Sequence, residues 1–323
     1  MSQKLKWIIG GSASTGSSLL AHMLGQHSKI YCGIETNLFI QSEWILHWDR
    51  LKKDINRASL DRVLSTGWHI HRGVQINGLL KGRNIDAIIS KSVDYKQFIY
   101  KIYSYICDDS TNHFIAEKTP SNAPNFHLLR SRFDDLKFVL TLRNPIDSII
   151  SMQKRGWSLI YSCGLYLFNI GLGYGAEKDI HVVKYEELIK DTPHTLSSVL
   201  KTVDLEYEND MASNFDGMEV LPSWRYGRTQ SEKDTVLLTS INQDTIDYLF
   251  DHLCFKDDFQ FYGRKPAFKN IREIAEHFSY TIHPSSNSWK EGVRIKSLLL
   301  LEKMKRSLRH YPCSGKNFPF VIR

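Results

Sequence analysis

Short apolar runs and helical patterns alternate between residues 5 and 205 of the chain. Five runs are continuous and are followed by glycine, polar or charged residues, which is typical of buried strands. These runs are Trp7–Ile9, Ile30–Cys32, Phe114–Ala116, Lys137–Leu142 and Ile180–Lys184. Because strands alternate with helices, the pattern predicts an α/β fold: a doubly wound, mostly parallel sheet flanked by helices.

The helix expected after the fourth run shows the clearest start signals. Asn144 suits the N-cap, Pro145 the first helical position and Asp147 the first turn. An isoleucine stripe follows and is predicted to be buried. Ser148 and Ser151 fall on the opposite side of the helical wheel, which we expect to be exposed.

The segments between the second and third runs are less regular. Leu38–Trp48 predicts an aromatic helix or lid, and its tryptophans are expected in the core. Residues 49–112 are mostly helical in pattern. Within them, the polar segment Thr66–Arg83 carries three glycines and is interpreted as a loop over a substrate site.

Beyond residue 205 the pattern predicts a helical C-terminal extension. Ile241–Leu253 has helical spacing, and Lys290–Arg309 is an amphipathic basic segment. No repeat or linker divides the chain. We therefore expect one domain over residues 1–323, with a core at about 4–205 and an extension over 206–323.

A glycine- and serine-rich loop follows the first apolar run. Gly11 and Gly16 stand five apart, as in the nucleotide-binding pattern G-x-x-x-x-G-K-S/T, but Ser17 takes the place of the lysine. A strand, a loop with glycines and a helix together form a cradle for an anion. The missing lysine argues against ordinary ATP or GTP hydrolysis. The fold is therefore expected to be P-loop-like, with an anionic ligand.

Five polar or charged residues come just after predicted strands: Ser14, Glu35, Lys118, Arg143 and Tyr185. Parallel sheets of this class bind ligands at the carboxyl ends of their strands. The sequence therefore predicts that these residues meet in a single site.

Composition limits the kinds of ligand and the cellular compartment that we expect for this protein. The formal net charge of +7 suits an anionic ligand, although no motif supports nucleic-acid binding. Five scattered cysteines form no C-x-x-C pair, so we expect neither a zinc site nor a disulfide framework. The N-terminus shows no signal peptide, and no apolar run is long enough to span a membrane. We expect a cytoplasmic protein.

Two motifs resemble those of the sulfotransferase family, which uses 3′-phosphoadenosine 5′-phosphosulfate (PAPS) as donor. Ser14–Ser18 corresponds to the family's loop K/R-S-G-T/S-T/S, which holds the 5′-phosphosulfate. Arg143 precedes Asn-Pro, and Ser151 follows eight positions later. In the family an arginine and a serine at this spacing bind the 3′-phosphate.

Three further matches narrow the branch of the family. Glu117–Pro120 is the E-K-T-P motif of the broad group that includes bacterial and Golgi-type enzymes. His27–Thr36 is similar to the tyrosylprotein sulfotransferases, whose glutamate at the position of Glu35 is the proposed base. Val183–Leu188 resembles the segment Y-E-D/E-L, whose tyrosine, here Tyr185, lies by the nucleotide.

The resemblance implies in-line sulfonate transfer from PAPS to a hydroxyl, with Glu35 as base and Lys118 stabilising the leaving oxygen. It implies that 3′,5′-bisphosphoadenosine (PAP) is the product and that no metal is needed. The implied donor-binding residues are Ser12, Ala13, Ser14, Thr15, Gly16, Ser17, Ser18, Arg143, Ser151 and Tyr185. The acceptor is a small-molecule, glycan or tyrosyl hydroxyl, nucleic acid and stable membrane insertion are not expected, and a homodimer stays open.

One position departs from the family pattern. Ser14 stands where the family has a basic residue that contacts the transferring sulfonate. Lys118 is then the main remaining cation, with Arg225 and Arg228 as further candidates. Two alternatives therefore stay open: a catalytically weakened or non-catalytic nucleotide-binding protein, and a P-loop kinase-like phosphotransferase.

Overall fold

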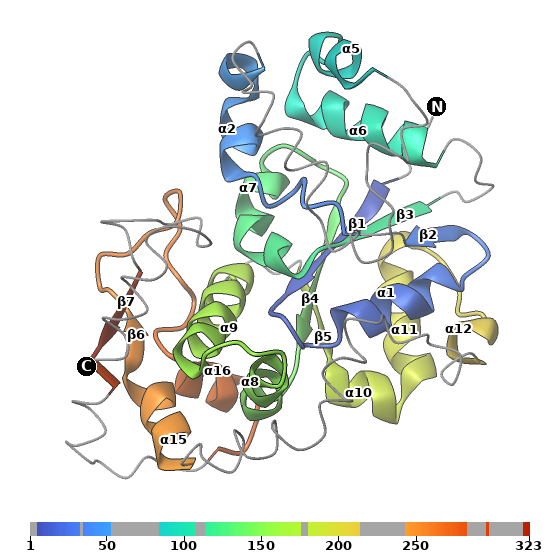
Figure 1. The fold of residues 1–323 in the computed structure, drawn as a ribbon. Coiled ribbons are helices and arrows are strands. Elements are labelled where there is room, and N and C mark those ends of the chain that lie inside the picture. The colour runs from blue at the N-terminus through green and yellow to red at the C-terminus, as the bar shows by residue number, and fades with distance from the viewer. Residues whose placement is uncertain are drawn as a thin grey trace.

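The computed structural model describes residues 5–32, 35–52, 84–107, 114–175, 180–213, 243–282, 295–296 and 319–323. A five-stranded sheet forms its centre (Figure 1). The strands are β1 (Leu5–Gly11), β2 (Ile30–Cys32), β3 (Phe114–Lys118), β4 (Lys137–Leu142) and β5 (Ile180–Lys184). All five apolar runs predicted as strands are therefore confirmed.

The sheet has the strand order β2-β3-β1-β4-β5, and every pair is parallel. The chain goes from β1 to one side of the sheet for β2 and β3, and then crosses to the other side for β4 and β5. Doubly wound sheets bind ligands beside such a reversal, at the carboxyl ends of the strands.

Helices cover both faces of the sheet (Figure 1). One face packs against a smaller core, to which Leu19, Leu188 and Leu196 contribute together with Trp7 and Ile9 of β1. The elements on this face are α1 (Ser17–Gly25), α10 (Tyr185–Lys190), α11 (Thr192–Leu200), the 3-10 turn η3 (Lys201–Val203) and α12 (Asp210–Ser213). Leu5 and Ile8 of β1 join the larger core on the other face, and the strand register is irregular between Leu5 and Trp7.

The larger core draws on elements from the whole chain. The 3-10 helix η2 (Pro120–Asn125) and α9 (Leu159–Gly173) pack most extensively against each other, and α8 (Pro145–Gln153) joins them. The remaining helices are α2 (Ser42–Leu51), α5 (Ile85–Ser90), α6 (Tyr95–Ile106), α7 (Phe126–Arg130), α15 (Gln243–His252) and α16 (Ile271–His277). Trp44 and Trp48 are buried in this core, as predicted.

The structure corrects two expectations. Ser148 is fully buried rather than exposed, because α9 packs against α8 and covers the side of the helix that the wheel assigned to solvent. The C-terminal extension is not purely helical: β6 (Leu253–Phe255) and β7 (Phe320–Ile322) form a two-stranded antiparallel sheet, and the predicted helix ends at His252.

Several expectations fall outside the described residues. These are the proposed loop over residues 66–83, most of the basic segment 290–309, and Arg225 and Arg228. Among the residues that are described, no helix is both long and apolar enough to cross a membrane.

Candidate active site

The loop between β1 and α1 leads into a helix N-terminus that no side chain caps. Gly16 is the N-cap residue, and the first turn of α1 contains no acidic residue. Gly16 has φ +89°, a left-handed conformation that glycine adopts without a steric penalty. The partial positive charge of such a terminus favours an anion.

Thr15 braces this loop from the inside. Its hydroxyl donates to the carbonyl of Ser12 at 2.7 Å and lies 2.8 Å from the hydroxyl of Thr141 on β4. Thr141 also lies 3.1 Å from the carbonyl oxygen of Gly10, to which it donates. The side chain of Thr15 therefore faces the protein interior.

Two serines of the same loop carry buried hydroxyls that, unlike the hydroxyl of Thr15, have no partner in the described part of the chain. The Oγ atoms of Ser12 and Ser14 have no hydrogen-bond partner among the described residues. Ser14 also has φ +66°, which is uncommon for a residue with a side chain. A buried hydroxyl without a partner costs free energy, so both groups fit oxygen atoms of a bound anion.

Lys118 brings three elements together at the carboxyl edge of the sheet. It ends β3, and its ammonium donates to Ser18 Oγ of α1 at 3.0 Å. The same ammonium forms an ion pair with Glu35, which lies in the segment between β2 and α2. The side chains of Lys118 and Glu35 are 7% and 13% exposed, so water screens this pair weakly.

Glu117, the neighbour of Lys118 on β3, is also buried. Its carboxylate accepts hydrogen bonds from Thr36, Thr119 and Asn122. Burial raises the pKa of Glu117, and these hydrogen bonds oppose the shift. Sequence patterns assign Glu117 no role of its own, because its partners come from two separate segments.

Arg143 and Tyr185 form the second half of the site. The guanidinium carbon of Arg143 lies 4.5 Å from the centroid of the Tyr185 ring. The same ring approaches Gly16 so closely that a Cβ built there would lie 2.6 Å from Tyr185 Cδ2. Arg143 Nε is buried and has no hydrogen-bond partner among the described residues. It therefore has a donor to offer to a phosphate.

Glu186 fixes the backbone around Arg143. One carboxylate oxygen accepts from the amide of Asn144 at 2.9 Å, and the other accepts from the hydroxyl of Tyr280 at 2.9 Å. Burial and the charge of Glu186 raise the pKa of Tyr280. The hydroxyl of Tyr166 on α9 donates to the carbonyl of Arg143 at 2.7 Å. The backbone at Arg143 and Asn144 is thus held by α9 and α10, and Tyr280, which follows α16, holds Glu186.

Arg155 is a cation that the sequence prediction missed. It lies half-buried in the turn after α8. Burial lowers the pKa of its guanidinium, the negative charge of Glu35 opposes that shift, and the positive charge of Arg143 adds to it. Arg155 is therefore within electrostatic range of both halves of the site.

The family assignment follows from a sequence comparison. The profile of the Sulfotransferase family matches residues 7–209, a range that contains the loop, Glu35, Lys118, Arg143 and Tyr185. The chain belongs to the sulfotransferase family. No curated protein matches this sulfotransferase by sequence.

Solved structures of sulfotransferases align along most of the chain. The sulfotransferase domain of the Synechococcus PCC 7002 olefin synthase is 18% identical and covers 86% of this chain and 96% of its own, with a TM-score of 0.48. The sulfotransferase domain from the curacin biosynthetic pathway is 17% identical, and the alignment covers 86% of this chain and 98% of that domain, with a TM-score of 0.49. The sulfotransferase STF9 from Mycobacterium avium is 11% identical, and the alignment covers 89% of this chain and 79% of STF9, with a TM-score of 0.40.

The other residues expected to bind the donor lie in the loop, at the start of α1 and on α8. Ala13 and Ser18 are half-buried in the loop and in the first turn of α1, and Ser17 is buried. Ser151 is half-buried on α8, eight residues after Arg143. The uncapped helix, the unpartnered hydroxyls and the available donor of Arg143 suit the anionic donor that the family uses.

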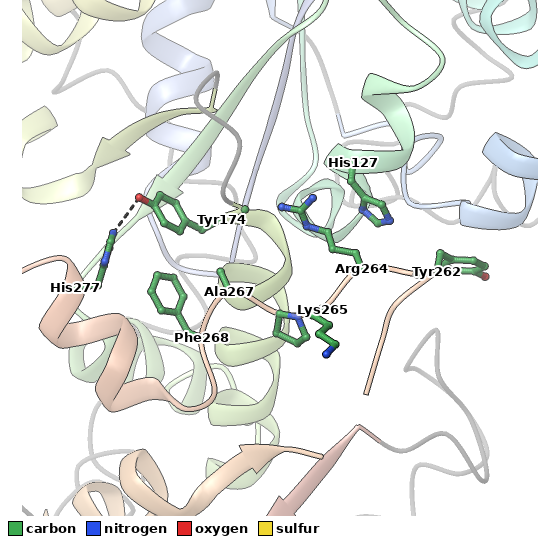
Figure 2. Close-up of a pocket in the computed structure, with 11 residues that line it drawn as sticks. His127, Tyr174, Tyr262, Arg264, Lys265, Ala267, Phe268 and His277 are labelled. Atoms are coloured by element: carbon green, nitrogen blue, oxygen red, sulfur yellow. Dashed lines mark hydrogen bonds between the residues drawn. The ribbon is translucent and has the colours of Figure 1, made fainter. Parts of the chain in front are cut away.

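A separate pocket lies beyond the end of α9 (Figure 2). It has a volume of about 770 Å³, and its lining includes Tyr174, Phe268, His277 and Arg264. None of the residues predicted for the site contributes to it. Tyr166, which contacts the backbone of Arg143, lies eight residues before Tyr174, or about 12 Å along the helix. The pocket is therefore distinct from the residues that gather at the edge of the sheet.

Proposed function

We propose that this protein transfers a sulfonate group from PAPS to a hydroxyl acceptor. The observation that carries the proposal is the position of the Lys118 ammonium. It contacts both Ser18 at the start of α1 and the carboxylate of Glu35. A cation and a base therefore stand together beside a loop that suits an anion.

In the proposed reaction, the oxygen of the acceptor hydroxyl attacks the sulfur of the bound donor. Glu35 accepts the proton from the acceptor hydroxyl as the new S–O bond forms. Lys118 stabilises the negative charge on the bridging oxygen as the old S–O bond breaks and PAP is released. Because the two side chains start as an ion pair, the acceptor hydroxyl must approach Glu35 beside the ammonium.

The donor would extend from the loop after β1 to Arg143 and Tyr185, the second half of the site. The loop Ser12–Ser18 holds the 5′ end through backbone N–H groups and hydroxyls, and Arg143 and Ser151 hold the 3′-phosphate. Tyr185 supports this arrangement because its ring lies against both Gly16 and Arg143. The acceptor is a small-molecule, glycan or tyrosyl hydroxyl.

A second candidate function rests on Ser14. Its short hydroxyl replaces the cation that stabilises the transferring sulfonate in the family. A protein that retained donor binding but lost most turnover would have this substitution. We favour the enzyme, because Lys118 and Glu35 are present and paired, and Arg155 adds positive charge nearby.

Calorimetric titration of the purified protein with PAP and with ATP tests the donor assignment. We expect PAP to bind much more tightly than ATP, because Arg143 has a donor available for a 3′-phosphate that ATP lacks. Tight binding of ATP without binding of PAP would overturn the proposal in favour of a kinase-like protein.

Transfer of sulfonate from PAPS to a panel of phenols, sugars and tyrosyl peptides tests turnover. Glu35→Gln is expected to lower kcat by about 100-fold while PAP affinity persists, because the amide cannot accept the proton. Unchanged turnover in this variant would remove Glu35 as the base. PAP binding without turnover on any acceptor would support the non-catalytic alternative.

A further inference from the structure

Glu117 has an unusually complete set of hydrogen bonds for a buried carboxylate. Its side chain is fully enclosed, and the whole residue is 1% exposed. Oε1 accepts from the amide of Thr36 at 3.2 Å, from the hydroxyl of Thr36 at 3.0 Å and from the hydroxyl of Thr119 at 2.7 Å. Oε2 accepts from Asn122 Nδ2. Burying a carboxylate is costly, and these four donors offset much of that cost.

Two adjacent residues on β3 face two adjacent residues before α2. Thr36 directly follows Glu35, and Glu117 directly precedes Lys118. Glu117 bonds Thr36 while Lys118 pairs with Glu35. Successive side chains of a strand point to opposite faces, so one contact lies on each side of the end of β3.

The segment that carries Glu35 needs such support. Residues 35–38 belong to no helix or strand, so no ladder of backbone bonds holds them. Glu117 accepts from both the backbone and the side chain of Thr36, and Tyr103 lies 3.3 Å from the same hydroxyl. Glu35 is thereby attached at its neighbour to the strand that presents Lys118.

We propose that Glu117 is a positioning residue that holds Glu35 against Lys118 through its two hydrogen bonds to Thr36. This inference rests on the proposed function, in which Glu35 and Lys118 act together. A carboxylate suits the position because it only accepts, and all four partners donate. Glutamine would turn an amide N–H toward Asn122, which already donates to the carbonyl of Ile9 at 3.3 Å.

The decisive variants change Thr36 and leave both members of the ion pair in place. Thr36→Val removes the hydroxyl bond at nearly constant shape, and Thr36→Ser restores the hydroxyl. Ser42→Ala is the matched control, because the Ser42 hydroxyl donates to Asn125 at 2.7 Å. That bond is also buried, but it joins the first residue of α2 to η2 and does not involve residues 35–38.

We expect Thr36→Val to lower kcat for transfer from PAPS by about tenfold or more, because the base is displaced from the cation. PAP affinity should stay within about twofold of the wild type. Thr36→Ser should recover most of the activity, and Ser42→Ala should lose thermal stability without a comparable loss of kcat. The inference is overturned if Thr36→Val lowers kcat no more than Ser42→Ala does.

Hydrogen–deuterium exchange separates this inference from the proposed function. In Thr36→Val and in Glu117→Gln, the peptide over residues 35–38 should exchange faster than in the wild type and in Ser42→Ala. This readout needs no acceptor and no turnover. If the wild type transfers no sulfonate, the proposed function fails, while faster exchange still supports the attachment of Glu35 through Thr36. Unchanged exchange in both variants overturns it.

Discussion

The guanidinium of Arg143 lies over the ring of Tyr185, 4.5 Å from its centroid. Arg143 follows β4 and Tyr185 follows β5, and these strands are neighbours in the sheet. The same ring contacts Gly16 in the loop after β1. The tyrosine therefore connects the loop expected to hold the sulfonate end of the donor with the arginine expected to hold its 3′-phosphate.

Tyr185→Ala should weaken PAP binding more than Tyr185→Phe does. The phenylalanine ring keeps the contact with Arg143, whereas alanine removes it and frees the guanidinium. We expect alanine to cost about 1 kcal/mol, which is about fivefold in Kd. Titration calorimetry with PAP measures the difference. Equal affinities for the two variants would show that the ring does not position Arg143.

Gly16→Ala should be more damaging than Gly156→Ala. Both glycines have a left-handed φ, +89° and +80°, so alanine costs about 1 kcal/mol of backbone strain at either position. Only at Gly16 does the added Cβ meet another residue, Tyr185, at 2.6 Å, whereas nothing lies within 4 Å of the Cβ at Gly156. Urea unfolding should show the larger loss for Gly16→Ala.

The same pair of variants separates stability from ligand binding. PAP affinity should fall in Gly16→Ala and stay near that of the wild type in Gly156→Ala, which lies in the turn after α8. If both variants bind PAP equally well, the contact between the loop and Tyr185 has no part in donor binding.

Ser14→Arg should raise turnover. A cation at this position would stabilise the charge that develops as the S–O bond breaks, and we expect kcat to rise by about tenfold or more. Ser14→Ala is the control for loss of the serine hydroxyl. A lower or unchanged kcat in Ser14→Arg would mean that the existing cations already supply this stabilisation.

The buried carboxyl of Glu117 should give stability a characteristic dependence on pH. Burial raises its pKa in the folded protein above the value of about 4.3 for an unfolded chain. The folded state then holds the proton more tightly, so ionisation of Glu117 lowers stability as pH rises from about 4.3 through the raised pKa. Glu117→Gln removes this contribution.

Urea unfolding of both proteins between pH 4 and pH 7 measures the effect. The unfolding free energy of the wild type minus that of Glu117→Gln should fall as pH rises over this range. A difference that rises with pH would mean that the hydrogen bonds to Glu117 outweigh the cost of burying its charge.

Local patterns were enough to predict much of the architecture. The five strands and the start of α8 follow from short-range signals, because a continuous apolar run and an Asn-Pro helix start are properties of neighbouring residues. Asn144 does accept from the amide of Ile146, as an N-cap should. The edge at which Glu35 and Lys118 meet also follows, since parallel strands all end on one side.

The burial of Ser148 could not be predicted from local patterns. A helical wheel averages over one helix and has no information about α9, which covers the serine. Glu117 and Arg155 are similar cases. The partners of Glu117 include Thr36, which is 81 residues away in sequence, and the charge of Glu35 acts on Arg155, which is 120 positions further along the chain.

The sequence by itself therefore determined the class of fold, the edge of the sheet that carries the site, and the main charged residues there. Tertiary structure alone decided how those residues are held. Thr15 faces the interior, Glu117 supports the segment of Glu35, and Tyr185 lies between Gly16 and Arg143. The physical reason is that strands and caps depend on neighbours along the chain, whereas buried hydrogen bonds and ring contacts depend on which distant segments pack together.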